Sequence, residues 1–193
     1  TATGVSSSAT GLNSTATGQN AQATQANATA LGRNAKATAV NTIATGVNST
    51  AQGIEATATG FETTASGAYA TTSGSRAIAS GFGTTASGAQ SEAIADRATA
   101  SGYDSVASGL NSTATGANSI ATGSNSTANG QNAQATAVST TAMGASSRAT
   151  GVNSTAIGQD SLADKINTTA TGVRGKATGI EATATGFETT ASG

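Results

Sequence analysis

The chain has 193 residues and a formal net charge of −1, with 3% aromatic and 9% charged residues and no Pro, Cys or His. So few large apolar side chains do not fill a conventional globular core, and a near-neutral chain without Pro is atypical of disorder. The eight Lys and Arg are scattered, so no electrostatic surface for nucleic acid or anionic lipid is expected. A repeat structure stabilised mainly by backbone pairing remains.

A seven-residue period runs through the chain from Gly4 to Gly193. Of the 28 positions reached in steps of seven, 23 are Gly, and the residue two positions earlier is Ala in 27 of 28 cases, Thr72 being the exception. The other residues at the glycine positions are Gln25, Ala39, Ala95, Ala137 and Lys165. Self-similarity at a fixed period predicts a solenoid, in which stacked copies bury a continuous core.

Each heptad reads turn, turn, small, x, Ala, x, Gly, as in Leu12–Gly18. Alternation along a strand places the small residue and the Ala on one face, which indicates that an opposite wall approaches that face closely. Asn dominates the second turn position, where its tolerance of the left-handed region suits a tight turn. Because Gln25 and Lys165 adopt positive φ reluctantly, the periodic Gly is expected to serve close approach more than positive φ.

Alternate heptads differ at the x positions, which makes fourteen residues the true unit. In the set that contains Thr15-Ala16-Thr17 the first x is Thr in 13 of 14 cases, and no x residue is charged. The other set carries charge at the same places: Lys36, Glu92, Arg148, Asp164 and Lys176. This difference predicts an all-β solenoid of two-stranded coils with one covered wall and one wet wall. The string GIEATATGFETTASG occurs at 53–67 and again at 179–193, so the two copies are nine coils apart and occupy the same register, as a duplicated length of the solenoid.

Self-association along the charge-free wall is expected, because coils lined by Ala and Ser bury little apolar area and homo-oligomers favour closed symmetry. The turns that lead into this wall are also mostly apolar. The predicted oligomer-facing residues are Thr15, Thr17, Leu31, Ile43, Thr113, Thr115, Met143 and Ile157. The Thr-x-Thr rows also resemble ice-binding β-solenoids, but bulky interruptions such as Leu31 favour an interface. A trimer by sedimentation, with no thermal hysteresis, would eliminate ice binding.

An Asn-free stretch between Asn48 and Asn111 contains four of the five aromatic residues. Exposed aromatics beside Arg are typical of contact hot spots. The candidate patch for contact with a ligand comprises Tyr69, Arg76, Arg97 and Tyr103. The alternative is ordinary variation on solvent-facing turns.

Enzymatic chemistry is not expected from this inventory. Without His or Cys, catalytic triads, thiol nucleophiles and the commonest zinc sites are excluded, and we expect no cofactor and no metal site. No apolar run approaches the ~20 residues of a membrane-spanning helix, so the chain itself is not expected to insert into a membrane. The seven N-x-S/T sequons follow from an Asn-, Ser- and Thr-rich composition.

The segment Asn153-Ser154-Thr155-Ala156-Ile157-Gly158 resembles the NSVAIG-type repeat of YadA-like heads in trimeric autotransporter adhesins of Gram-negative bacteria. The resemblance implies a left-handed parallel β-roll, a homotrimer, and a place on the cell surface, with the outer-membrane anchor outside this fragment. It also implies ligands such as collagen, fibronectin or other host matrix and cell-surface proteins. We expect residues 1–193 to form one head domain of about 14 coils, cut from a longer surface protein. A rigid spacer without its own ligand is the alternative function.

Overall fold

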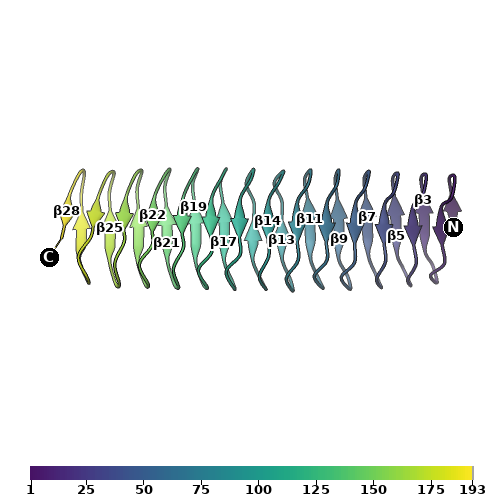
Figure 1. Cartoon of the computed structure of the whole chain (residues 1–193), viewed down its shortest axis with the longest axis horizontal. Coiled ribbons are helices and arrows are strands. Elements are labelled where there is room, and N and C mark those ends of the chain that lie inside the picture. Colours follow the sequence, from purple (N-terminus) through teal and green to yellow (C-terminus); the bar gives the residue numbers. More distant parts are fainter. Residues whose placement is uncertain (193) are drawn as a thin grey trace. The chain divides into compact units, whose positions relative to one another are not determined.

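In the computed structural model the described residues, 1–192, form strands and tight turns with no helix (Figure 1). None of these residues therefore belongs to a helix that could cross a membrane. The contacts divide the chain into two compact units, Thr1–Arg97 and Ala98–Gly193. Each unit contains 14 of the strands, and each coil contributes two of them, so a unit has seven coils.

In the first unit the odd-numbered strands form one parallel sheet, called the odd sheet, and the even-numbered strands form the even sheet. The odd strands are β1 (Ala2–Thr3), β3 (Thr15–Thr17), β5 (Thr29–Leu31), β7 (Ile43–Thr45), β9 (Thr57–Thr59), β11 (Thr71–Ser73) and β13 (Thr85–Ala86). The even strands are β2 (Ser8–Ala9), β4 (Gln22–Ala23), β6 (Lys36–Ala37), β8 (Thr50–Ala51), β10 (Thr64–Ala65), β12 (Ile78–Ala79) and β14 (Glu92–Ala93). Every pair keeps a 14-residue register, as in Thr15 opposite Thr29.

The second unit repeats this arrangement. Its odd strands are β15 (Thr99–Ala100), β17 (Thr113–Thr115), β19 (Thr127–Asn129), β21 (Thr141–Met143), β23 (Thr155–Ile157), β25 (Thr169–Thr171) and β27 (Thr183–Thr185). Its even strands are β16 (Val106–Ala107), β18 (Ile120–Ala121), β20 (Gln134–Ala135), β22 (Arg148–Ala149), β24 (Leu162–Ala163), β26 (Lys176–Ala177) and β28 (Thr190–Ala191). The predicted all-β parallel solenoid with 14-residue coils is confirmed.

The interior of each unit is built from Ala and from small hydroxyl residues. Ala16 and Ala23, which face each other from the two walls of one coil, are fully buried. Most of the buried hydroxyls bond locally: Ser14 Oγ donates to Gly11 O at 2.7 Å and Thr42 Oγ1 to Ala39 O at 2.7 Å. The exceptions are Thr72, Ser112, Ser126 and Ser154. Because these bonds satisfy the hydroxyls within their own turn, polar residues are tolerated in so narrow a core.

The second position of the turns is left-handed throughout, as at Asn13, where φ is 56°. This confirms the reason proposed for Asn there. The periodic glycines are of two kinds. Most of those that follow odd strands have φ between 117° and 144°, and a Cβ on Gly18 would lie 2.6 Å from Gly32 O. Those that follow even strands, such as Gly81, lack positive φ but also approach the next coil closely.

The five natural replacements at glycine positions all follow even strands: Gln25, Ala39, Ala95, Ala137 and Lys165. The expectation that Gly serves close approach more than positive φ is therefore right for the turns after even strands. It is wrong for most turns after odd strands, because backbone in that region of φ is accessible almost only to Gly.

Thr72 is the one interior strand residue that replaces the periodic Ala, and its hydroxyl is buried without a hydrogen-bond partner. Thr72→Val keeps the shape and removes the unsatisfied hydroxyl. We expect the free energy of unfolding to rise by about 1 kcal/mol, which thermal or urea unfolding followed by circular dichroism measures.

The matched control is Thr84→Val. Thr84 is equally buried, but its Oγ1 donates to Gly81 O at 2.9 Å. Losing that bond should lower the free energy of unfolding by about 1 kcal/mol. Equal destabilisation by the two substitutions would contradict this account of Thr72.

Candidate interaction surfaces

The eight residues predicted to face an oligomer partner all lie on the outer face of the odd sheet. Four belong to the first unit and four to the second. Alternation explains the placement, since Ala16 is buried while Thr15 and Thr17 on either side point outward. The four bulkiest members, Leu31, Ile43, Met143 and Ile157, are 38–43% exposed. Within residues 1–192 this face carries no charged side chain.

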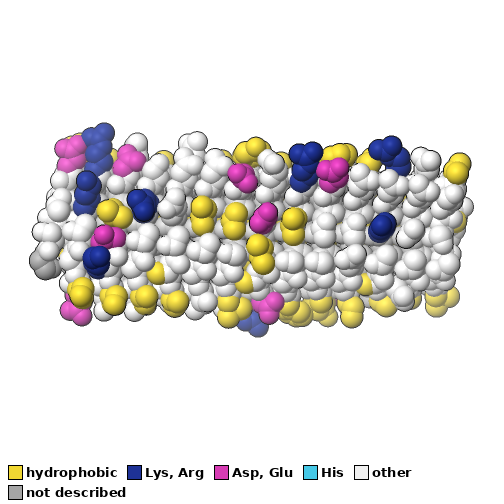
Figure 2. Space-filling view, viewed as in Figure 1, with side chains coloured by type: hydrophobic (Ala, Val, Ile, Leu, Met, Phe, Trp, Pro, Cys, Tyr) yellow, Lys and Arg dark blue, Asp and Glu magenta, His cyan; other side chains and the backbone are white. Residues whose placement is uncertain are grey.

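The turns that lead into the odd strands extend this apolar character along one edge of each unit. Their first positions hold exposed large hydrophobic residues: Leu12, Val40, Ile54 and Phe82 in the first unit, and Leu110, Val138, Val152, Ile166 and Ile180 in the second. Figure 2 shows hydrophobic side chains recurring along an edge, and charged side chains at a few places on the otherwise polar surface, some of them as adjoining groups of opposite charge. Exposed large apolar side chains that recur along one edge are typical of an interaction site.

The outer face of the even sheet is different, because charged side chains interrupt it. Lys36, Arg148 and Lys176 are exposed there. The structure therefore places the charge-free positions and the charge-bearing positions on different faces. That the charge-free face is covered by a partner stays a prediction.

The three residues of the candidate patch that belong to the first unit do not form one cluster. Tyr69 lies in the turn before β11, and Arg97, the last residue of the first unit, lies on the same edge, where its amide bonds to Phe82 O. Arg76 lies in the turn after β11, on the opposite edge. Tyr103 belongs to the second unit. Arg76 Nε is also bound to Glu62 Oε2 at 3.0 Å, so part of its charge is compensated.

Tyr69 instead contacts a residue outside the predicted patch. Its ring packs against Phe82 in a T-shaped arrangement, with ring centroids 5.3 Å apart. The Phe82 turn is held in place because its amide donates to Asp96 Oδ1 at 2.9 Å and its carbonyl accepts from the Arg97 amide at 2.8 Å. Tyr69, Phe82 and Arg97 therefore share one edge. The sequence spacing of the two aromatic residues could have indicated their contact, because Phe82 follows Tyr69 by one residue less than a full coil.

Ladders of Asn side chains run along the turns, a feature that the sequence analysis did not identify. Asn20 Nδ2 donates to Asn34 Oδ1 at 3.2 Å, and Asn34 Nδ2 donates to Asn48 Oδ1 at 2.9 Å. Identical residues recurring every 14 positions could have indicated the ladder, because parallel in-register stacking aligns such amides.

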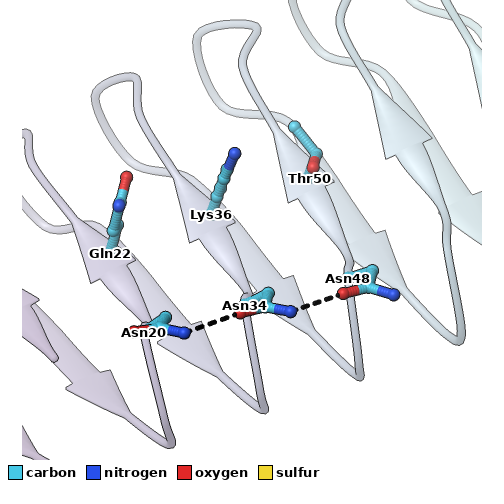
Figure 3. A pocket seen from close by; sticks show the side chains of 6 residues that line it. All are labelled: Asn20, Gln22, Asn34, Lys36, Asn48 and Thr50. Carbon is cyan, nitrogen blue, oxygen red and sulfur yellow. Dashed lines mark hydrogen bonds between the residues drawn. The ribbon is translucent and has the colours of Figure 1, made fainter. Parts of the chain in front are cut away.

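A groove runs beside this ladder in the first unit, and Figure 3 shows the side chains that line it. Its volume is about 400 Å³, and it is lined by Asn20, Gln22, Asn34, Lys36, Asn48 and Thr50. A second groove, of about 440 Å³, lies in the second unit and is lined by Asp160, Arg174, Lys176, Glu188 and Thr190. Among residues 1–192, no three Asp or Glu side chains gather in a way that would hold a metal ion.

Comparison with known proteins identifies the repeat. The model of the YadA head domain repeat matches overlapping segments 1–21, 9–35, 23–49, 44–70, 58–84, 79–105, 93–119, 100–126, 121–147 and 149–174. Among solved structures, the collagen-binding domain of the Yersinia adhesin YadA is 29% identical, with 71% of this chain and 69% of that chain covered and a TM-score of 0.47. No protein of curated function matches the chain. Because head repeats cover most of its length, the chain belongs to the YadA head domain repeat family.

Proposed function

We propose that the chain is the head of a bacterial surface adhesin that attaches the cell to host extracellular matrix or host cells, and that it has no catalytic role. The observation that carries this proposal is the match of YadA head repeats over most of the chain. The related Yersinia domain binds collagen, which supports collagen-like or fibronectin-like matrix proteins as the class of ligand. The cell surface is the corresponding location.

The functional form is a homotrimer that associates through the outer face of the odd sheet and its adjoining apolar edge. Two observations support this arrangement: the face lacks charged side chains within residues 1–192, and Leu31, Ile43, Met143 and Ile157 are exposed on it in the single chain. Three copies of a weak contact site would then act together, and multivalency converts weak contacts into high avidity.

The decisive experiment compares this head fragment with the intact surface protein for binding to immobilised collagen, fibronectin and other matrix proteins. Retention of the intact protein's affinity supports adhesion by the head. Loss of binding with an intact trimer would mean that the coils serve as a rigid spacer for a binding domain elsewhere.

The candidate patch leads to a mutational prediction. We expect binding to the matrix ligand to be lost when four exposed side chains are truncated to Ala, because aromatic and Arg side chains contribute most of the energy at interfaces. The substituted residues are Tyr69, Arg76, Arg97 and Tyr103. Solid-phase binding measures the affinity, and sedimentation checks that the oligomer is intact.

A control variant carries Arg148→Ala and Phe187→Ala, which remove an exposed Arg and an exposed aromatic elsewhere. It should bind as the unsubstituted chain does. Unchanged binding by the four-residue variant would eliminate the patch. Because Tyr69 packs on Phe82, a Phe82→Ala variant should show part of the same loss.

A further inference from the structure

The amide-lined groove of the first unit has the dimensions and the chemistry of a ligand site. Its volume of about 400 Å³ falls within the range of ligand pockets, roughly 300–1,000 Å³. Most such pockets have predominantly apolar walls, but all six lining residues here are polar. The groove therefore suits a ligand that offers hydrogen-bonding groups along its length and little apolar surface.

The Asn ladder leaves regularly spaced hydrogen-bonding capacity along one side of the groove. Within residues 1–192, the Asn34 side chain donates one hydrogen bond to Asn48 and accepts one from Asn20. An amide side chain can donate two and accept two, so Asn34 retains one donor and one acceptor. Successive strands lie about 4.8 Å apart, so this pair of groups recurs at that interval. A sugar hydroxyl is likewise both donor and acceptor, and adjacent ring hydroxyls match such a row.

Lys36 supplies the only formal charge among the groove's lining residues. It projects from β6 between Gln22 and Thr50, opposite the ladder (Figure 3). Within the described residues Lys36 forms no ion pair; the ion pairs found there join Arg76 to Glu62 and Arg174 to Glu188. The ammonium group is therefore available to an anionic ligand.

The groove of the second unit provides a natural comparison. Lys176 occupies there the same place in the coil as Lys36, ten coils later. However, Asp160 and Glu188 line that groove, and Glu188 is bound to Arg174. In the second groove, carboxylates stand in place of neutral amides, so they compensate the positive charge and repel an anion. Of these two grooves, the first is therefore the one that combines amides with spare hydrogen-bonding groups and a cation without an acidic neighbour in the lining.

We propose that the groove formed by Asn20, Gln22, Asn34, Lys36, Asn48 and Thr50 binds a carboxylate-bearing sugar unit of an extended saccharide. The amide row binds the ring hydroxyls, and Lys36 binds the carboxylate. An acidic peptide would satisfy Lys36 but would find no apolar wall for its other side chains. This proposal names a ligand class for the adhesive role and thus rests on it, although the groove is separate from the residues of the candidate patch.

The test titrates the full chain with a hyaluronan hexasaccharide, in which glucuronic acid alternates with N-acetylglucosamine, and measures affinity by calorimetry. We expect Lys36→Ala and Asn34→Ala each to weaken binding at least tenfold, and Lys176→Ala to leave it unchanged. The carboxyl methyl ester of the same hexasaccharide should bind at least tenfold more weakly, since it retains the hydroxyls and loses the charge.

Three outcomes would overturn the proposal: no binding of the hexasaccharide, equal binding by the Lys36→Ala chain, or equal affinity for a hexaglutamate peptide. The last would show that charge alone determines binding. Attachment to matrix proteins is measured in parallel on the same protein. If that attachment persists while the saccharide fails to bind, the ligand class is wrong and the adhesive role stands. If both fail, the adhesive role fails as well.

Discussion

A Gly144→Ala variant is expected to lose about 3–5 kcal/mol of stability, a very large effect for the addition of one methyl group. Gly144 has φ of 126°, a conformation that other residues rarely adopt. A Cβ there would lie 2.7 Å from both the carbonyl carbon and the oxygen of Gly158 in the next coil. These atoms are backbone, so relief requires the two coils to separate and their hydrogen bonds to break.

The damage should spread beyond the substituted turn. In a solenoid each repeat is stabilised chiefly by its neighbours, so separating two coils removes an interface from both. We expect a lower melting temperature by circular dichroism. Hydrogen exchange should increase first at β21 and β23, the strands that meet across this contact.

Gly83→Asn is the matched control for this prediction. Gly83 also has positive φ, of 62°, but a Cβ there would meet no atom within 4 Å. Asn occupies the equivalent turn position in many other coils with φ near 56°, so the substitution should leave stability unchanged or slightly higher. Equal losses from the two variants would show that positive φ alone, without the approach of the next coil, determines the requirement for Gly.

The features that sequence predicted correctly are those that every coil repeats. Period, strand position, interior Ala and the left-handed Asn each depend on residues close together in the chain, and the repetition multiplied the signal. The difference between glycines after odd strands and glycines after even strands was not predicted. The replacements Gln25 and Lys165 were interpreted as evidence about every glycine position, although both residues follow even strands. When the positions after odd strands and those after even strands are considered separately, all five replacements follow even strands.

The candidate site was less predictable, because its contacts join different positions of neighbouring coils. The Tyr69–Phe82 ring contact links the second turn position of one coil to the first turn position of the next, which a search for equivalent positions does not find. Arg76 was grouped with Tyr69 from their proximity in the chain, although seven residues carry the backbone across to the other edge of the solenoid. In a two-edged coil, sequence neighbours half a repeat apart are spatially separated.

The proposed trimer leads to the second large prediction, that Ile43→Lys converts the oligomer to monomers. Ile43 is 43% exposed in the single chain, on the outer face of the odd sheet between Thr29 and Thr57. In an assembly covering that face, the new ammonium would be buried without an acidic partner, since the face carries no charged side chain within residues 1–192. An uncompensated buried charge costs about 3–5 kcal/mol, and a trimer would contain three of them. With each 1.4 kcal/mol weakening association tenfold, dissociation at micromolar concentration should be complete by sedimentation equilibrium.

Ile78→Lys makes the same chemical change on the even sheet, where Ile78 is 37% exposed. A Lys is already accommodated on that sheet at Lys36, in the same position of its coil, so the trimer should persist. Both variants should retain the circular dichroism spectrum of the unsubstituted chain, because both positions point outward from a coil whose interior is unchanged. Dissociation by Ile78→Lys but not by Ile43→Lys would place the interface on the even sheet. A monomeric unsubstituted chain would remove the proposed trimer altogether, and with it the avidity on which adhesion through a shallow surface depends.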